Sequence, residues 1–256
     1  MPVTDLARRL WPDFRAALEL LTRLPLPARA DDAARPSAGA AWAWPLAGLV
    51  PAAAAGVGAT ASAGLGLPPS LCAAFALAAG VTVTGAMHED GLADCADGFW
   101  GGWDAQRRLD IMKDSHIGSY GVLALALSVL IRWQALAAIL SAGWLWAPLV
   151  ASAALSRAVM PALMAALPNA RGSGLSASVG SPNWPTAGAS AGLALALALV
   201  FLPLATVTAA ASGAILAAVV AGATARAKIG GQTGDVLGAG QQLAEIAALT
   251  ALAATL

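Results

Sequence analysis

The stretch SYGVLALALSVLIRWQALAAIL, residues 119–140, carries one charged side chain, Arg132, and is otherwise dominated by leucine, alanine, valine and isoleucine. A helix needs about 20 predominantly apolar residues to cross the hydrocarbon core of a bilayer. Backbone N–H and C=O groups in lipid must be hydrogen-bonded within the protein, so only helices and closed barrels span membranes. The stretch lacks the regular alternation of a barrel strand and therefore predicts a transmembrane helix.

The rest of the chain is almost as apolar. Hydrophobic residues make up 59% of its 256 residues and charged residues 11%, and the mean hydropathy is +0.72, which excludes an ordinary soluble domain. We predict an all-α fold, a polytopic integral membrane helical bundle of about seven transmembrane helices, with residues 1–256 as a single membrane domain in the lipid bilayer. The other apolar stretches lie at 40–66, 70–87, 144–166, 187–208, 210–225 and 241–256.

Residues 1–38 form an amphipathic segment that precedes the first span. The first 35 residues contain six arginines and five acids, together with Pro12, Pro25 and Pro27, and they have no apolar core of the signal-peptide type. Arginine-rich ends stay in the cytoplasm, and an even number of spans separates this end from residues 88–118 and 226–240. We expect a bacterial cytoplasmic (inner) membrane protein whose site faces the cytoplasm.

Charge and cysteine content exclude several classes of function. The formal net charge is zero and the basic residues form no dense patch, so no nucleic-acid partner is expected. Cys72 and Cys95 are the only cysteines, which provides neither a disulfide framework nor a zinc site. Nothing in the sequence decides whether the chain forms a homo-oligomer.

Acidic residues are concentrated in the 88–118 segment, which we predict to be catalytic. Within HEDGLADCADG, Asp90, Asp94 and Asp97 stand at positions i, i+4 and i+7, so on a helix they share one face. Like charges at this spacing repel each other unless a cation lies between them, and carboxylates are preferred ligands of Mg²⁺. We predict that all three bind Mg²⁺, the expected cofactor, and that Asp94 or Asp97 also takes a catalytic role. A solvated acidic loop is the alternative.

Basic residues follow these acids directly. Lys113 is predicted to contact a substrate phosphate, and Arg107 and Arg108 are weaker candidates for the same role. His116 is predicted to contact substrate rather than to act as a general base, because a lone histidine beside acids is more often a hydrogen-bonding group. Salt bridges to the neighbouring acids would explain the same pattern.

Three other regions carry candidate residues. The turn GGQTGD, residues 230–235, precedes the last apolar helix, where free N–H groups can bind phosphate, and we predict that Gln232 and Asp235 bind substrate. Arg157 lies inside an apolar run, as an anion ligand or a snorkelling side chain, and is also predicted to bind substrate. The polar loop 171–185 either cradles a nucleotide or connects two helices, and connection is favoured.

Four blocks of sequence, in the order LLTRLPLP, HEDGLADCADG, IMKDSHIGSYG and GGQTGDVLGAGQQLAE, resemble the cobalamin 5′-phosphate synthase family, also called adenosylcobinamide-GDP ribazoletransferases. The resemblance covers nearly the whole chain and includes a Ser-Arg pair at Ser156 and Arg157. The sequence differs from the family pattern at Glu89, where leucine is usual, and at His116, where arginine is frequent.

The resemblance implies an activity and its substrates. Members of the family are integral membrane proteins that use Mg²⁺ to join adenosylcobinamide-GDP to α-ribazole 5′-phosphate or α-ribazole, with release of GMP. This implies that a ribose hydroxyl of ribazole attacks the phosphorus on the cobinamide side, at the last assembly stage of the cobalamin nucleotide loop.

Two other functions fit part of this pattern. A CDP-alcohol phosphotransferase also displaces a nucleoside monophosphate, but its signature requires Ala-Arg after the first Asp-Gly, and Ala93 is followed here by Asp94. A cation or metabolite transporter would carry ionisable groups in the middle of its spans. Because the acids gather in one connection, catalysis at the membrane surface is favoured.

Overall fold

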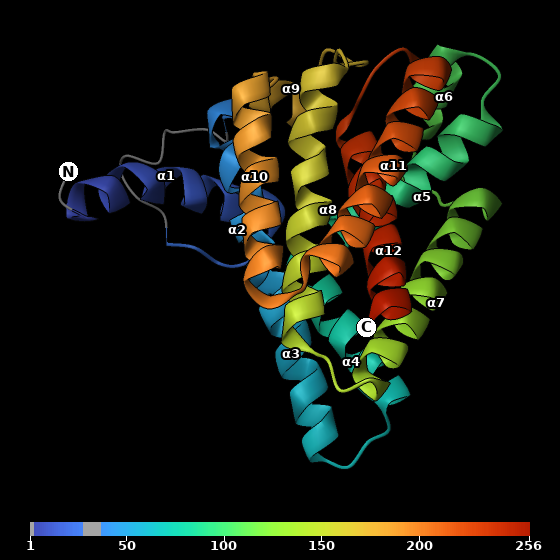
Figure 1. Ribbon diagram of the computed structural model, residues 1–256. Helices are drawn as coiled ribbons and strands as arrows, with labels where there is room; N and C mark the ends of the chain where they lie inside the picture. The colour runs from blue at the N-terminus through green and yellow to red at the C-terminus, as the bar shows by residue number, and fades with distance from the viewer. Residues whose placement is uncertain (1–2, 28–36) are drawn as a thin grey trace.

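The computed structural model describes residues 3–27 and 37–256, and within these ranges the chain is helical without any strand. Most of the long helices run side by side, while α1 lies across them (Figure 1). The elements are α1 (Val3–Leu21), the 3₁₀ helix η1 (Ala38–Ala43), α2 (Trp44–Ala47), α3 (Leu49–Gly64), α4 (Pro69–Thr84), α5 (Met87–Gly101), α6 (Ala105–Ile111), α7 (Ser119–Ser141), α8 (Trp146–Ala166), α9 (Leu175–Val179), α10 (Trp184–Phe201), α11 (Leu204–Ile229) and α12 (Gly234–Thr255).

The predicted membrane bundle is confirmed. Six helical stretches of the described chain are long and apolar enough to cross a bilayer, and α4 with α5 makes a seventh candidate that is bent by 88°. Large apolar side chains on the outer faces of α7 and α11 are exposed, as expected for contact with lipid; they include Leu123, Leu127, Leu130, Ile215, Leu216 and Val219. The six stretches are Ala38–Gly64, Ser119–Ser141, Trp146–Ala166, Trp184–Phe201, Leu204–Ile229 and Gly234–Thr255.

The bend between α4 and α5 directs the acidic segment toward the bundle. Gly85 and Ala86 both adopt left-handed backbone conformations, with φ of 64° and 58°, and their N–H groups donate to carbonyls of the last turn of α4. Two successive left-handed residues end the helix and redirect the chain. The backbone N–H of Arg23 donates to the carbonyl of Val83 at 2.8 Å, so the LLTRLPLP segment supports this bend.

Small residues let α5 pack closely against α12. A Cβ at Gly91 would lie 2.7 Å from the carbonyl oxygen of Asp235, and a Cβ at Gly238 would lie 3.2 Å from the Cα of His88. Larger side chains at these two glycines would therefore separate the helices. Close contacts of this kind are typical of helix pairs in membranes, where packing replaces the hydrophobic drive.

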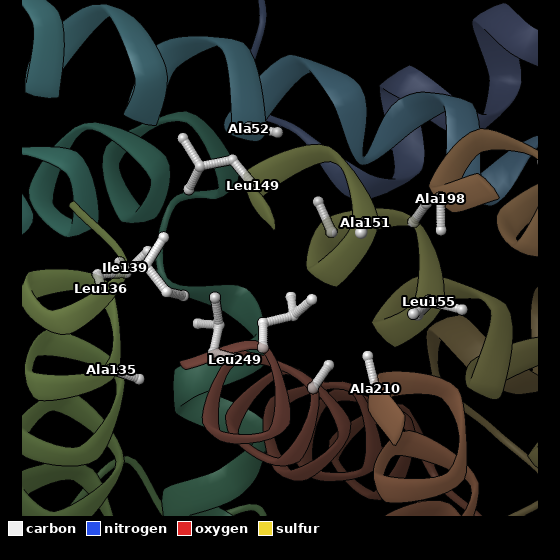
Figure 2. Packing of buried hydrophobic residues seen from close by; sticks show 14 of the residues in the cluster. Ala52, Ala135, Leu136, Ile139, Leu149, Ala151, Leu155, Ala198, Ala210 and Leu249 are labelled. Carbon is white, nitrogen blue, oxygen red and sulfur yellow. The ribbon is translucent and has the colours of Figure 1, made fainter. Parts of the chain in front are cut away.

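The largest core cluster is rich in alanine. Figure 2 shows it where α3, α7, α8, α10, α11 and α12 meet, and its labelled members are Ala52, Ala135, Leu136, Ile139, Leu149, Ala151, Leu155, Ala198, Ala210 and Leu249. Alanine allows helix backbones to approach, while the few leucine and isoleucine side chains fill the spaces between them. A second cluster holds α1 through Ala17, Leu18 and Leu21, which pack near Trp44 and Met164.

Candidate functional site

The acidic face of α5 lies beside the first turn of α12. Asp90 is exposed and Asp94 is half-buried on α5, and Asp94 lies within electrostatic range of Asp235 and Asp97 as well as Asp90. The close approach of α5 and α12 at Gly91 brings the backbone of Asp235 to this face. Residues more than 130 positions apart thus form one group of carboxylates.

Arg171 provides the positive charge of this group. Its Nη1 lies 2.9 Å from Oδ2 of Asp235, and both side chains are largely buried. Its Nε and Nη2 are enclosed and have no hydrogen-bond partner among the described residues. The loop that begins at Arg171 was predicted to be a connection rather than a nucleotide cradle, and no sequence pattern near Arg171 indicates that it meets an acid of the last helix.

Hydrogen bonds hold the Arg171 loop against the GGQTGD turn. The backbone N–H of Gln232 donates to the carbonyl of Pro168 and that of Ala170 donates to the carbonyl of Gln232, both at 2.8 Å. The side chain of Asn169 accepts from the N–H groups of Arg171 and Gly172 at 3.0 and 2.7 Å. The position of Arg171 relative to the start of α12 is therefore fixed by the backbone.

Gln232 was predicted to bind substrate and lies within this junction. Its residue surface is 1% exposed, and its side-chain Oε1 has no hydrogen-bond partner among the described residues. Its backbone groups form the two bonds that join the loops. The structure shows a role for Gln232 in joining the loops, and its contact with substrate stays a prediction.

A cavity of about 190 Å³ opens between these elements, and we call it the site cavity. Its lining includes the charged residues Asp90, Asp235 and Arg171 and the polar residues Ser173 and Ser176. Apolar and sulfur-containing residues also line it, namely Leu20, Leu21, Trp44, Met87, Met160, Met164, Leu175, Val179 and Leu237. A mixed lining of this kind suits a ligand with a charged group and an apolar part.

Asp97 is turned toward α7. Its Oδ2 accepts from the N–H of Gly118 at 2.7 Å and its Oδ1 from the N–H of Gly121 at 2.9 Å. A Cβ on either glycine would lie 2.4 Å from a carboxylate oxygen, which explains the glycines of the IGSYG motif. Asp97 therefore caps the N-terminus of α7, a favourable place for a negative charge. Its predicted metal and catalytic roles stay predictions.

Lys113 and His116 lie on the exposed segment that follows α6. Neither is among the described residues that line the site cavity. The His116 side chain is 90% exposed, and its Nδ1 lies 2.7 Å from Oδ1 of Asp114. The hydrogen bonds from His116 lower the pKa of the Asp114 carboxyl below its usual value. The predicted substrate contacts of Lys113 and His116 stay predictions.

Arg157 lies in a separate, deeper cavity of about 60 Å³, which we call the inner cavity. Its Nη1 lies 3.5 Å from Oε2 of Glu245, whose Oε1 is 3.4 Å from Nη1 of Arg132. Arg132 also donates to Oε1 of Glu89 at 3.0 Å. The structure therefore places Arg157 in a buried ion network and not with the acids of the site cavity. His88 lines both cavities.

The charge at the site cavity is suited to a hydrated divalent cation. Within residues 3–27 and 37–256, no group of three or more His, Cys, Asp and Glu side chains is already arranged around one metal position. Mg²⁺ usually takes one or two carboxylates together with waters and substrate phosphates. Asp90 and Asp235 fit that requirement because they line the cavity, and with Asp94 within electrostatic range the three carboxylates outnumber the one arginine beside them.

Comparison with known proteins adds a strong sequence relationship. The family model described as cobalamin-5-phosphate synthase matches residues 13–253. Proteins named adenosylcobinamide-GDP ribazoletransferase are similar to the chain in Bradyrhizobium diazoefficiens (43% identical over 99% of this chain and 98% of the relative), Mesorhizobium japonicum (44%, over 94% and 93%) and Brucella ovis (43%, over 94% and 95%). No solved structure matches the chain.

Proposed function

The chain belongs to the cobalamin-5-phosphate synthase family, and we propose that it joins adenosylcobinamide-GDP to α-ribazole 5′-phosphate or α-ribazole and releases GMP. One structural observation carries the proposal: Asp90, Asp235 and Arg171 line the site cavity, with Asp94 within electrostatic range of all three, although these residues come from distant parts of the chain. A cluster of acids with one arginine is suited to phosphoryl transfer, which depends mainly on positioning and charge neutralisation.

In the proposed reaction a ribose hydroxyl of ribazole attacks the phosphorus on the cobinamide side of the diphosphate. A new P–O bond forms there, the bond to the bridging oxygen breaks, and GMP leaves with the bonding electrons. The hydroxyl proton passes to a carboxylate, for which Asp94 is our first choice because it is half-buried and flanked by other acids. Asp90 and Asp235 line the cavity and would hold the metal.

Mg²⁺ would neutralise negative charge on the diphosphate and on the departing GMP. The protein groups contribute orientation: Asp235 is held at the start of α12, where Thr233 caps the helix by accepting from the N–H of Val236. Arg171 is held to the same turn by the bonds between the two loops. Closely fixed groups of this kind raise the rate by keeping reactants in a productive arrangement.

We also propose that the site faces the cytoplasm of a bacterial inner membrane. Support comes from contacts between the charged segments 88–118 and 226–240. Nη1 of Arg108 donates to the carbonyl of Lys228 at 2.9 Å, and the Lys228 ammonium is 5.3 Å from the centre of the Trp100 ring. α6 and the C-terminal end of α11 lie together at the top of Figure 1. Basic residues at one end of the spans favour the cytoplasm.

Purified protein in detergent tests the proposal. Adenosylcobinamide-GDP, α-ribazole 5′-phosphate and Mg²⁺ are added, and GMP release and the cobalamin product are measured together. We expect equal amounts of both products, and neither product when Mg²⁺ is removed by chelation. CDP-alcohol substrates serve as the matched control, because CMP release from them would support the rival lipid enzyme. A folded protein that forms no product in several detergents and in lipid vesicles contradicts the proposal.

A further inference from the structure

Arg171 leaves one edge of its guanidinium group unused. The Nη1 atom pairs with Asp235, while Nε and Nη2 are enclosed and have no hydrogen-bond partner among the described residues. Nε and Nη2 lie on the same side of the planar group, and this side forms paired hydrogen bonds to two oxygens of a carboxylate or phosphate. Buried donors without an acceptor are unfavourable, and because Arg171 lines the site cavity, a small turn of its side chain toward the cavity would give this edge a partner on a ligand.

The surroundings of Arg171 restrict what that partner is. Ser173, Ser176 and the backbone of Gly174 line the same cavity, and Asp90 also belongs to its lining. The hydroxyl groups are further donors for an anion, whereas Asp90 carries a charge of the same sign as the anion. An anion bound here therefore needs the arginine as well as a cation that offsets the charge of Asp90. A phosphate group that also binds a divalent metal ion meets both requirements.

The Arg171 loop is held in place before any ligand binds. The Asn169 side chain accepts two backbone N–H groups of the loop and donates to the Ser176 hydroxyl at 2.9 Å. Gly172 and Gly174 adopt positive φ values of 67° and 89°, which other residues rarely tolerate. A loop ordered in this way loses little conformational freedom on binding.

We propose that Arg171 binds the diphosphate of the nucleotide-activated substrate through its Nε and Nη2 edge. The inference rests on the proposed function for the identity of the substrate. The geometry then places the diphosphate beside Asp235, because the same guanidinium group contacts both. The P–O bond that breaks lies next to the carboxylates, where the metal and the proton acceptor are proposed.

Direct binding of GDP, a soluble diphosphate, tests this inference without turnover. Calorimetry in detergent with Mg²⁺ compares the wild-type protein with Arg171→Gln, Arg171→Lys and the control Arg226→Gln, whose side chain is exposed near the end of α11. Loss of a two-bond contact to phosphate is expected to weaken GDP binding about tenfold or more in Arg171→Gln. Lysine should restore part of the affinity, because it keeps the charge but not the paired bonds.

Two other ligands identify the phosphate that Arg171 contacts. Guanosine should bind the wild-type protein and Arg171→Gln equally, because it has no phosphate. Ribose 5-phosphate should also be insensitive to Arg171→Gln; if it loses affinity while GDP does not, the arginine contacts the ribazole phosphate and the inference is wrong. Unchanged GDP binding in Arg171→Gln likewise overturns it, as does an equal loss for guanosine.

A double-mutant cycle separates phosphate binding from neutralisation of Asp235. Arg171→Gln is made in the wild-type protein and in Asp235→Asn. If Arg171 contacts phosphate, its removal weakens GDP binding in both backgrounds. If it only offsets the charge of Asp235, the effect disappears when Asp235 is neutral, which overturns the inference. Arginine-dependent GDP binding without any product in the wild-type protein would contradict the proposed function and leave the inference standing.

Discussion

Two groups of charged residues lie on either side of His88, and their charge balance differs. The inner cavity has two acids, Glu89 and Glu245, and two arginines, and each charged group lies within 3.5 Å of an opposite charge. At the site cavity Asp90 and Asp235 lie with Arg171 in the lining and Asp94 is within electrostatic range, and among these described aspartates only Asp235 forms an ion pair with Arg171. The charges of the inner network balance one another, although Nε and Nη2 of Arg132 and Nε of Arg157 have no hydrogen-bond partner among the described residues. The site cluster has more acids than bases and needs a further cation.

Adjacent residues of α5 belong to different groups. Glu89 points to the inner network, while Asp90 lines the site cavity. Successive side chains on a helix are separated by about 100°, so neighbours in the sequence meet different surroundings. What distinguishes the two acids is their partners: the inner arginines come from α7 and α8, and the site arginine comes from the loop before α9.

The largest effect is expected from neutralising the site cluster. Asp94→Asn should reduce GMP release by about a thousandfold or more, since it removes a proton acceptor and weakens metal binding. The folded protein should persist, because burial and repulsion from Asp235 and Asp90 outweigh the attraction of Asp94 to Arg171. GMP release and thermal unfolding in detergent are measured on the same sample. Near wild-type turnover would remove Asp94 from the mechanism.

A change in the inner network should affect stability rather than the chemical step. Glu245→Gln removes the acid that contacts both Arg132 and Arg157. Breaking a buried ion pair from one side lowers the free energy of unfolding by about 3–5 kcal/mol. Denaturation in mixed detergent measures the loss, and Glu19→Gln, on the half-exposed pair with Arg15, is the control.

The Mg²⁺ dependence of the folded enzyme distinguishes the inner network from the site cluster more clearly. Glu245→Gln should keep the Mg²⁺ requirement of the wild-type protein, whereas Asp235→Ala should need more Mg²⁺ or more substrate, with activity reduced about 10–100-fold. Asp235 lines the site cavity and Glu245 lines the inner one. An equal shift of the Mg²⁺ requirement in both variants would show that the two groups act as one site.

The sequence predicted the helical bundle well because length and hydropathy determine where a chain can span a bilayer. The helical spacing of Asp90 and Asp94 also predicted their shared face on one element. It did not show that Asp97 caps α7, since this depends on the space left by Gly118 and Gly121 in the folded chain. The capping contact forms only when α5 and α7 pack together, so it has no local sequence pattern.

Arg171 and Arg157 illustrate a second limit of prediction from the sequence. Both are arginines outside the acidic motifs, and Arg157 was favoured for substrate binding because the Ser156-Arg157 pair is part of the family resemblance. The partners of each are set by tertiary contacts: Arg157 meets Glu245 on α12, and Arg171 meets Asp235 through the backbone bridge at Gln232. Neither pairing has a local sequence pattern that identifies it.

Asp97→Ala provides an intermediate case between the two groups. It removes two hydrogen bonds to the first turn of α7 and should lower the free energy of unfolding by about 1–2 kcal/mol. If capping is its whole role, the Mg²⁺ requirement of turnover stays at the wild-type value. A raised Mg²⁺ requirement without loss of stability would instead support the metal role predicted from its spacing. Thermal unfolding and a Mg²⁺ titration of GMP release give the two readouts.

The smallest effect is expected at His116. Its ring is exposed and pairs with Asp114 on the surface, and an ion pair surrounded by water contributes little to stability. His116→Ala should therefore leave unfolding unchanged and the KM for adenosylcobinamide-GDP within about twofold of wild type, as expected for a group outside the cavity lining. A much larger KM would mean that the segment after α6 moves onto the bound substrate, which is the contact that the sequence predicted. The same measurement on Lys113→Gln separates the two residues, because a phosphate contact at Lys113 would raise KM while His116→Ala would not.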